Sequence, residues 1–350
     1  MKQISTAVIS HGISARTFHI PFILTHHGFH LRTIMERNGN TAAEKYPWIH
    51  TARNFEEVIE DPETELVVIC SPNTTHYPYA RAAMEAGKHV IVEKPFTNTT
   101  AEAKELISVS KATNRICAVY QNRRYVADFL TMKKIIDTGL IGEPREFFAH
   151  YDRYRPHPRT YGLWREEPLP GSGIFYDLGP HLIDQALVLF GMPLFIRADI
   201  RSMKPYSQVD DYFDVRLEYE NLIVTLHASM LVREMGPRYM LHGTKGSFIK
   251  SGEDPQEELL KAGKMPDTAE WGTEPVENYG FLHTETEGTV IREKYPSLQG
   301  GYHLFYDNIH KTIRMGQPLQ ETPDDGYRVI NIIEHAFEAS RKGCKLPVIP

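Results

Sequence analysis

The chain has few cysteines, and its three, Cys70, Cys117 and Cys344, show no C-x-x-C spacing. Neither a disulfide framework nor a thiolate zinc site is therefore indicated. Cys70 and Cys117 lie in apolar, strand-like runs, where cysteine acts as a small core residue. The sequence also has no run of 18 apolar residues, and its N-terminus enters a short strand rather than the apolar region of a signal peptide. We therefore expect a cytoplasmic protein without a membrane partner.

No sign of charge dominates the sequence. Its 39 basic and 45 acidic side chains give a net charge of -6. This balance argues against nucleic acid or an anionic membrane as the main partner and leaves small neutral or anionic ligands open. The 350 residues, 41% hydrophobic and 24% charged, are enough for two globular domains with separate cores.

The first third of the chain alternates short apolar runs with stretches of helical spacing. Strands are predicted at Thr6–Ser10, Leu31–Glu36, Leu66–Cys70, His89–Val92 and Ile116–Tyr120, and helices at Phe55–Glu60, Pro78–Ala86 and Ala101–Thr113. Such alternation implies a parallel, doubly wound sheet. We assign residues 1–122 to this Rossmann-type α/β domain.

The turn after the first predicted strand, residues 10–15, is only partly glycine-rich. A dinucleotide-binding fold carries G-x-G-x-x-G/A here, and only Gly12 and Ala15 match it. Gly12 would let the backbone approach a pyrophosphate, and Ala15 is small enough for close helix packing. Ser10 replaces the glycine of the tight turn, so a plain loop is the alternative interpretation of this segment.

Two charged residues end the second predicted strand. Glu36 lies about 20 residues beyond the glycine turn, where an acidic side chain binds a ribose 2′-hydroxyl. Arg37 offers a guanidinium that could stack on adenine or pair with a 2′-phosphate. NAD and NADP are both expected cofactors, and a solvated strand end is the alternative.

The tripeptide Glu93-Lys94-Pro95 ends another apolar run, at the point where proline stops the strand. In open α/β sheets the carboxyl ends of the strands face the ligand crevice, so Lys94 is delivered to the place of a substrate. A lysine there is costly unless something uses it. Lys94 is therefore the first catalytic candidate, and a solvated loop lysine is the alternative.

Polar residues follow other strands of this domain. Pro72 and Asn73 are plausible cofactor contacts, whereas His76 is expected rather to cap or line the next helix. Asn122 follows the last strand and could touch substrate. The full set of candidate cofactor contacts is Ser10, Gly12, Ile13, Ser14, Ala15, Glu36, Arg37, Ser71, Pro72, Asn73, His76, Glu93, Lys94, Asn122, Trp164 and Arg165.

A polar stripe marks a helix predicted from Asp177 to Phe190. Asp177, His181, Asp184 and Gln185 share one face, and the other faces, with Leu178, Leu182, Ile183, Leu187 and Val188, are apolar and expected to be buried. Such a stripe usually borders a wet cavity. A structural histidine or a solvated helix face is the alternative. A metal held by Asp177 and His181 has no third ligand at a suitable spacing, so no metal site is expected.

Beyond residue 122 the organisation changes. After a helix at Phe129–Thr138, extended runs are predicted at Arg145–Tyr154, Phe195–Met203, Tyr212–Tyr219, Ile223–Met230 and Arg238–His242. Helices are predicted at Asp254–Ala262, Tyr302–Arg314 and Pro323–Lys342. Residues 123–350 are therefore expected to form an α+β domain with a large, mainly antiparallel sheet that the Asp177 helix covers on one face.

These residues together resemble the Gfo/Idh/MocA family of NAD(P)-dependent sugar and cyclitol dehydrogenases. The resemblance runs end to end and is most specific in Glu93-Lys94-Pro95 and in residues 173–185. Residues 151–156, 164–166 and 242–250 are similar to the bacterial branch that contains NADP-dependent scyllo-inositol dehydrogenases.

The resemblance implies roles for particular residues. Lys94, Asp177 and His181 correspond to the catalytic residues of that family. His181 suits the general base, and Lys94 would stabilise alkoxide charge or move the proton itself. Asp177 would orient the substrate and the imidazole. The substrate contacts implied are Lys94, Asn122, Tyr154, Asp177 and His181.

Other expectations concern the second domain. Trp164 and Arg165 are interpreted as a flap over the cofactor, with an ordinary anchored loop as the alternative. The open face of the large sheet resembles the surface that the family uses for oligomer contacts, so a homodimer or homotetramer is expected. The chain is interpreted as an oxidoreductase acting on a secondary hydroxyl of a cyclic polyol or sugar. The alternatives are an aldose dehydrogenase and a catalytically silent, cofactor-binding regulatory protein.

Overall fold

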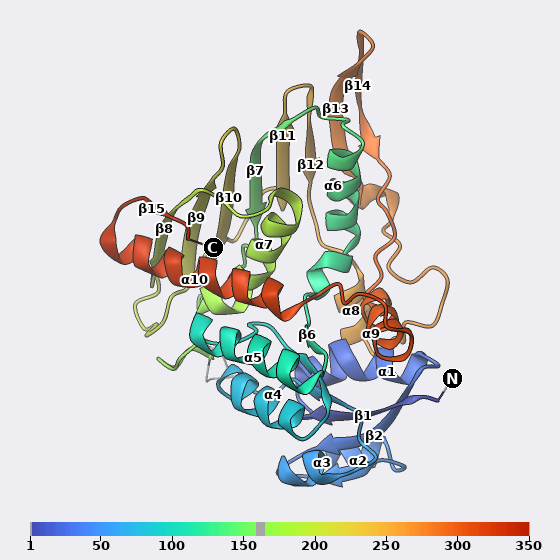
Figure 1. Cartoon of the computed structure of the whole chain (residues 1–350). Coiled ribbons are helices and arrows are strands. Elements are labelled where there is room, and N and C mark those ends of the chain that lie inside the picture. The colour runs from blue at the N-terminus through green and yellow to red at the C-terminus, as the bar shows by residue number, and fades with distance from the viewer. Residues whose placement is uncertain (1, 159–164, 350) are drawn as a thin grey trace. The chain divides into compact units, whose positions relative to one another are not determined.

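The computed structural model describes residues 2–158 and 165–349 (Figure 1). The chain forms two compact units, one of residues 1–122, 256–271 and 301–330 and one of residues 123–255, 272–300 and 331–350. The break after residue 122 lies at the expected domain boundary, but the two later segments join the first unit rather than the second. Among the described helices, none combines the length and hydropathy of a membrane span.

The later segments join the first unit because they carry part of its aromatic core. Helix α9 (His303–Met315) brings Phe305 to 4.8 Å from the ring of Tyr120, and Tyr306 stacks on Phe22 at 6.0 Å between ring centroids. All four residues are buried: Phe305 and Tyr306 are 0% exposed, and Tyr120 and Phe22 are 1% exposed. Local sequence spacing predicts such a helix but not the sheet on which it packs.

A six-stranded parallel sheet forms the centre of the first unit, in the order β3-β2-β1-β4-β5-β6. Its strands are β1 (Ile4–Ile9), β2 (Phe29–Met35), β3 (His50–Ala52), β4 (Leu66–Ile69), β5 (His89–Val92) and β6 (Cys117–Val119). The strand order reverses between β1 and β4, which places a ligand crevice at their carboxyl ends. The predicted doubly wound sheet is confirmed, although the edge strand β3, a short run without an apolar pattern, was not predicted.

Helices cover both faces of this sheet. Right-handed crossovers place α4 and α5 on one face and α1 on the other, where α1 packs with α9 (Figure 1). Helix α5 begins with a capping box in which Thr99 and Glu102 bond each other's backbone, and it ends at left-handed Asn114. The described helical segments of this unit are the π-turn η1 (Ala15–His19), α1 (Ile20–Thr25), α2 (Thr41–Lys45), α3 (Glu56–Glu60), the 3₁₀ turn η2 (Asn73–Thr75), α4 (His76–Glu85), α5 (Thr100–Thr113), α8 (Gln256–Lys261) and α9.

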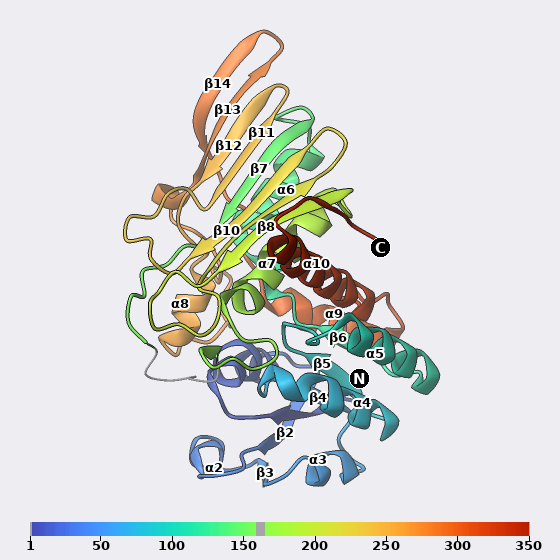
Figure 2. The same cartoon turned by 90° about the vertical axis from the view of Figure 1, so that its left-hand side faces the viewer.

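A nine-stranded sheet forms the second unit, in the order β14-β13-β12-β11-β7-β10-β9-β8-β15 (Figure 2). Its strands are β7 (Pro144–His150), β8 (Phe195–Arg201), β9 (Tyr212–Glu218), β10 (Ile223–Ser229), β11 (Tyr239–Gly243), β12 (Gly246–Lys250), β13 (Gly280–Thr286), β14 (Thr289–Tyr295) and β15 (Leu346–Pro347). Neighbouring strands run antiparallel except β7 and β10, which are parallel. The predicted mainly antiparallel sheet is confirmed.

The sequence analysis missed β12, β13 and β14 for an identifiable reason. Lys250 occupies a fully buried position of β12, where it pairs with the buried carboxylate of Glu274 at 3.0 Å. A charged residue at an inward position breaks the alternation that predicts a strand. Strand β14 is exposed over most of its length, so it has no apolar face to reveal it.

Helices cover one face of this sheet and leave the other open. Helix α6 (Ala127–Asp137), α7 (Ile174–Phe190) and the C-terminal half of α10 (Pro323–Lys342) lie on the same face (Figures 1 and 2). The ring of Phe175 on α7 lies 4.9 Å from Phe213 of β9 and 5.3 Å from Phe337 of α10. The 3₁₀ turns η3 (Asn122–Tyr125) and η5 (Val276–Asn278) complete the second unit's described elements. Most described side chains on the uncovered face are half-buried or exposed.

Helix α7 begins at Ile174, three residues before the predicted start. The Asp210 carboxylate accepts from the N–H of Phe175 at 2.7 Å, and the Asp210 carbonyl accepts from Ile174 at 2.9 Å. Gly173 precedes the helix at φ +91°, and a Cβ there would lie 2.1 Å from Oδ1 of Asp210. A cap from a distant loop leaves no signal in local spacing. Val188, predicted to be buried, is 37% exposed.

Candidate active site

The turn after β1 is tight although Ser10 stands where the first glycine of the dinucleotide-binding pattern is expected. Ser10 adopts φ +92°, a left-handed conformation that favours glycine, and its N–H donates to the carbonyl of Met35 at 3.1 Å. The Ser10 Oγ in turn accepts from the N–H of Gly12 at 3.1 Å. Serine thus supplies the tight turn at the cost of backbone strain and offsets part of that strain with a local hydrogen bond.

A π-turn, η1, follows this loop and leads into α1. The N–H of Arg16 donates to the carbonyl of Gly12 at 3.1 Å, so helical hydrogen bonding begins at the glycine. Ala15 is fully buried against the sheet, whereas Ile13 at the tip is 51% exposed. Single π-turns often occur at functional sites because they re-aim the side chains that follow. Here the π-turn ends at His19, which is buried.

Glu93, at the carboxyl end of β5, joins the two loops of this crevice. Its carboxylate accepts from Ser14 Oγ, lies 3.1 Å from Nε2 of His19 and accepts from the N–H of Lys94 at 3.0 Å. Burial alone would raise the pKa of Glu93, but the hydrogen bond and charge of His19, the Lys94 ammonium and the Ser14 hydroxyl lower that pKa to about 2. Glu93 is therefore a buried anion that holds the turn after β1 and the end of β5 together.

Lys94 follows Glu93 directly and is half-buried. The Lys94–Pro95 bond is cis, and the carbonyl of Pro95 lies 2.8 Å from Nδ1 of His76. The other ring nitrogen of His76 lies 3.0 Å from the carbonyl of Ser71. His76 thus links the loop after β4 to the loop after β5. His76 is also the first residue of α4, in agreement with the expectation that it caps or lines this helix.

The loop after β4 is built from short polar contacts. Ser71 Oγ lies 2.5 Å from Thr75 Oγ1, and the Thr75 N–H donates to the carbonyl of Pro72 at 2.8 Å. Pro72 is exposed at the loop, whereas Asn73 is 3% exposed. Asn122, which ends the first segment of the first unit, is also buried, at 4%. Pro72 is thus the one of these three candidates with an exposed surface.

Glu36 and Arg37 differ in their surroundings: the Glu36 carboxylate is hydrogen-bonded, whereas Arg37 is exposed. The carboxylate of Glu36 accepts from Thr41 Oγ1 at 2.6 Å, from the Thr41 N–H at 3.3 Å and from the Ala42 N–H at 2.9 Å. Burial raises the pKa of Glu36, and these bonds outweigh it and lower the pKa below its ordinary value. Glu36 therefore caps α2, while Arg37 beside it is exposed.

The polar stripe of α7 divides along its length. Toward the C-terminus, Asp184 forms a paired bond with Arg124, at 2.6 and 2.8 Å. Gln185 donates to the carbonyl of Arg123 at 2.9 Å and accepts from Tyr239 Oη at 2.9 Å. These two residues are 2% and 0% exposed and tie α7 to neighbouring segments of the second unit, so this part of the stripe is not a solvated helix face.

The first part of α7 carries the remaining two residues of the stripe. Asp177 has a side chain that is 26% exposed and lies 3.8 Å from the guanidinium of Arg165. His181, one turn later, is 7% exposed and has the ring of Tyr151 at 6.4 Å. An acid and a histidine thus follow each other on one helix face. Lys94 belongs to the first unit, and these two residues belong to the second.

Three further site candidates have different outcomes. Tyr154 is 40% exposed and stacks under Arg233, whose guanidinium lies 4.2 Å from the ring centroid and 2.7 Å from the hydroxyl. Trp164 lies outside the described residues, whereas Arg165 is described and lies beside Asp177.

Sequence reasoning missed two members of the Glu93 cluster. Nδ1 of His19 lies 2.7 Å from the hydroxyl of Tyr306 on α9, and both residues are fully buried. Their signal in the sequence is weak, because a histidine in an apolar stretch and a tyrosine in an amphipathic helix usually serve packing. His19 is singled out only by its contact with the buried carboxylate of Glu93, at the end of β5.

The first unit fits a bound dinucleotide. Gly12 is half-buried in the turn, where a Cβ would lie 3.2 Å from Ser10 Oγ, and Ile13 offers an exposed apolar side chain. The turn lies at the carboxyl end of β1, where the strand order reverses and dinucleotides bind. These features define a dinucleotide-binding class of protein.

Comparison with known proteins identifies the family. Residues 4–121 match the description "Oxidoreductase family, NAD-binding Rossmann fold", and residues 133–348 match "Oxidoreductase family, C-terminal alpha/beta domain". The chain belongs to the Gfo/Idh/MocA oxidoreductase family. It is an NAD(P)-dependent dehydrogenase, and the resemblance inferred from its sequence is confirmed.

Named relatives cover nearly the whole chain. The NADP(+)-dependent scyllo-inositol 2-dehydrogenase IolW of Bacillus subtilis is 36% identical over 339 residues, which cover 97% of this chain and 94% of IolW. Levoglucosan dehydrogenase of Pseudarthrobacter phenanthrenivorans is 33% identical over 89% of this chain and 87% of its own. The solved structure of the oxidoreductase yvaA from Bacillus subtilis has a TM-score of 0.95 at 35% identity and covers 99% of both chains.

Proposed function

We propose that this dehydrogenase transfers a hydride between NAD(P) and a secondary hydroxyl of a cyclic polyol or sugar. The observation that carries the proposal is the position of Lys94 at the carboxyl end of β5, next to the buried anion Glu93 that is bonded to the phosphate turn. An ammonium group held beside a dinucleotide turn is suited to a reacting alcohol oxygen. The names of two relatives, an inositol dehydrogenase and a levoglucosan dehydrogenase, support a ring substrate.

The proposed chemistry assigns a role to three side chains. When bound, the nicotinamide exchanges the hydride at the alcohol carbon. His181 takes or returns the hydroxyl proton, because an imidazole titrates near neutral pH. Lys94 donates a hydrogen bond to the reacting oxygen and stabilises its developing negative charge. Asp177, one helical turn before His181, orients the substrate hydroxyls.

The residues expected to contact the adenosine end of the cofactor, Glu36 and Arg37, favour NADP over NAD. Both carboxylate oxygens of Glu36 are engaged by Thr41 and Ala42 at the start of α2. A ribose 2′-hydroxyl would therefore compete with established hydrogen bonds. The exposed guanidinium of Arg37 offers a partner for a 2′-phosphate, and a guanidinium–phosphate pair is a strong, geometrically specific contact.

A spectrophotometric assay tests the proposed reaction. Purified protein is supplied with NADP or NAD and a panel of inositols and pyranose sugars, and with NADPH or NADH and the corresponding ketones, while absorbance of the reduced cofactor is followed. Lys94→Ala should lower the turnover number by about 10²-fold or more and leave cofactor binding measurable by fluorescence titration. The matched control is Lys111→Ala, an exposed lysine on α5 of the same unit.

The outcomes separate the proposal from its alternatives. Turnover of a ring alcohol by wild type and Lys111→Ala, and not by Lys94→Ala, supports it. Turnover only at the anomeric carbon of aldoses would contradict the proposed reaction at a secondary hydroxyl and would indicate an aldose dehydrogenase. Full activity of Lys94→Ala would remove Lys94 from the chemistry.

A further inference from the structure

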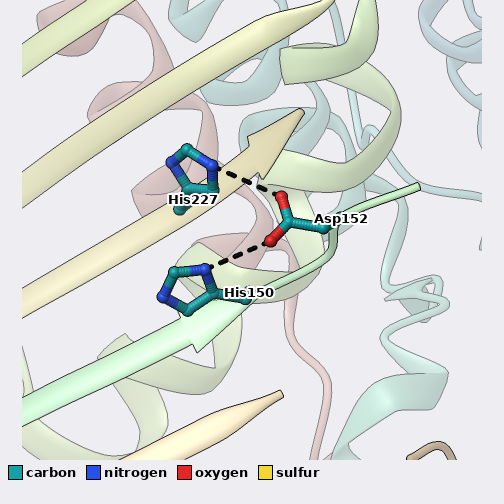
Figure 3. A group of neighbouring side chains, drawn as sticks. All are labelled: His150, Asp152 and His227. Atoms are coloured by element: carbon teal, nitrogen blue, oxygen red, sulfur yellow. Dashed lines mark hydrogen bonds and ion pairs between the residues drawn. The ribbon is translucent and has the colours of Figure 1, made fainter. Parts of the chain in front are cut away.

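The open face of the nine-stranded sheet carries a cluster that the dehydrogenase reaction does not use. His150 is the last residue of β7 and His227 lies on β10, and the register of this parallel pair sets the two residues opposite each other. Asp152, two residues beyond His150, comes to lie between the two rings (Figure 3). All three belong to the second unit and are half-buried.

Both imidazoles direct a nitrogen at the same carboxylate. Nδ1 of His150 lies 3.3 Å from Oδ2 of Asp152, and Nε2 of His227 lies 3.3 Å from Oδ1 (Figure 3). One ligand atom from each residue can be chosen so that all lie within 4.8 Å of one another. Both 3.3 Å contacts are longer than a usual charge-assisted N–H···O bond, about 2.7–2.9 Å. They match the separation of about 3.3 Å between two ligands of a tetrahedral zinc ion that each lie about 2.0–2.1 Å from the metal.

The surroundings of the cluster hold its members in place. The other ring nitrogen of His227, Nδ1, faces Oδ2 of Asp214 at 3.5 Å, across the register pair that joins β10 to β9. A histidine that binds a metal usually donates its second N–H to a carboxylate in this way. Asp152 is itself fixed, because its Oδ1 accepts from the backbone N–H of Ser229 at 3.0 Å.

The donor set selects among metals. Two imidazoles and one carboxylate suit zinc and its divalent transition-metal neighbours, whereas magnesium and calcium prefer sites built from oxygen alone. Three protein ligands leave one position of a tetrahedron for water or another small donor. The side chains of Asp152 and His227 are 10% and 17% exposed and that of His150 is 29% exposed, so an ion could reach the cluster from solvent.

We propose that His150, Asp152 and His227 bind one divalent transition-metal ion of the zinc type, with Asp214 as the carboxylate that orients His227. The site lies on the open sheet face and ties β7 to β10, the parallel pair of this sheet. None of its ligands is among Lys94, Asp177 and His181, the residues assigned to the proposed dehydrogenase reaction.

The test uses the full-length, untagged protein after removal of metals with a chelator. Zn²⁺ is titrated against a chromophoric chelator, and Co²⁺ is titrated while its visible absorption is recorded. One ion per chain should bind in wild type, and the Co²⁺ complex should give the intense bands of four- or five-coordinate geometry. Asp152→Asn, which keeps the size of the side chain, and His227→Gln should each weaken this binding by at least about 100-fold and abolish the bands.

Two further variants make the result specific. His242→Gln alters another half-buried histidine of the same sheet face, on β11, and should leave both metal titrations unchanged. Asp214→Asn should weaken Zn²⁺ binding by about 10–100-fold while the Co²⁺ bands persist, because it acts through the orientation of His227. Saturating Zn²⁺ should also raise the Tm of wild type but not that of Asp152→Asn.

Several results would overturn the proposal. One is an equal Zn²⁺ affinity in wild type and Asp152→Asn. Another is a Zn²⁺ stoichiometry that His227→Gln does not lower. The third is a weak Co²⁺ spectrum in wild type, typical of six oxygen ligands. Circular dichroism of each variant shows whether it is folded. If Asp152→Asn is unfolded, the Co²⁺ titration of His227→Gln decides the question alone. Ring-alcohol turnover should be the same in these variants, so its absence bears on the dehydrogenase proposal and not on the metal site.

Discussion

Nε2 of His19 lies 3.1 Å from Oε1 of Glu93, across 74 residues of sequence. The contact joins the π-turn that follows the phosphate loop to the strand end that carries Lys94. Since Nδ1 of His19 also contacts Tyr306 Oη, at 2.7 Å, the same imidazole reaches helix α9. This buried histidine thus links the turn after β1, the end of β5 and helix α9 within the first unit.

Replacing Glu93 by glutamine should destabilise the protein. The amide cannot accept from Ser14, His19 and the Lys94 N–H together, and one buried donor loses its partner. We expect a loss of about 2 kcal/mol in the free energy of unfolding, measured by urea denaturation at pH 7. Glu44→Gln, an exposed glutamate of the same unit, is the matched control and should change it by less than about 0.5 kcal/mol. Equal stability of the two variants would show that the cluster contributes little.

The same carboxylate should give the protein an acid-dependent stability. The pKa of Glu93 is lowered from 4.5 to about 2. Because the folded-state pKa is the lower one, the stabilisation is complete above about pH 4.5 and is lost as the pH falls toward 2. Its size is on the order of 3 kcal/mol. Urea midpoints measured between pH 7 and pH 3 should fall more steeply for wild type than for Glu93→Gln, and parallel curves would contradict the shift.

Cofactor preference should depend on Arg37. Arg37→Ala should raise the Kd of NADPH about tenfold or more, because a charge-assisted contact to phosphate contributes about 1.5–3 kcal/mol. The Kd of NADH, which has no 2′-phosphate, should stay within about twofold and serves as the internal control. Fluorescence titration of both cofactors measures the ratio. A similar loss for both would indicate that Arg37 stacks on adenine instead.

The start of helix α7 should be sensitive to a single methyl group. Gly173→Ala places a Cβ 2.1 Å from Oδ1 of Asp210 at a positive φ, and should cost about 2–4 kcal/mol. Gly191, at the other end of the helix, also has a positive φ, +75°, but has open space around it. Gly191→Ala should therefore cost only the backbone strain, about 1–3 kcal/mol, and less than Gly173→Ala. Thermal unfolding of both variants separates the steric clash from the backbone strain, and equal losses would exclude the clash.

Local sequence patterns predicted most of the first sheet because its strands are buried on both faces. Such strands are continuous apolar runs, as in His89–Val92, whose predicted and observed bounds agree. The same patterns failed where burial is satisfied by charge, as at Lys250, or where a cap comes from far along the chain, as Asp210 does for α7. In these places a tertiary contact decides the structure.

The candidate site follows the same division. Lys94 and Asp177 could be found because each stands at a predicted element boundary, and Ser10 because it interrupts a known spacing. The capping role of Glu36 could not be found, since the helix that it caps is only five residues long and has no periodic pattern. The histidines of the open sheet face escaped notice because their proximity depends on the parallel register of β7 and β10.

The division of the chain into interleaved segments has a consequence for biosynthesis. The nucleotide-binding unit needs Tyr306 and Phe305 of α9, which the ribosome makes long after residues 1–122. A fragment that ends at residue 122 would expose the apolar surface that these rings cover. The first sheet therefore lacks the cover that α9 supplies until nearly all of the second unit has been synthesised, and the two units are expected to mature almost together at the end of translation.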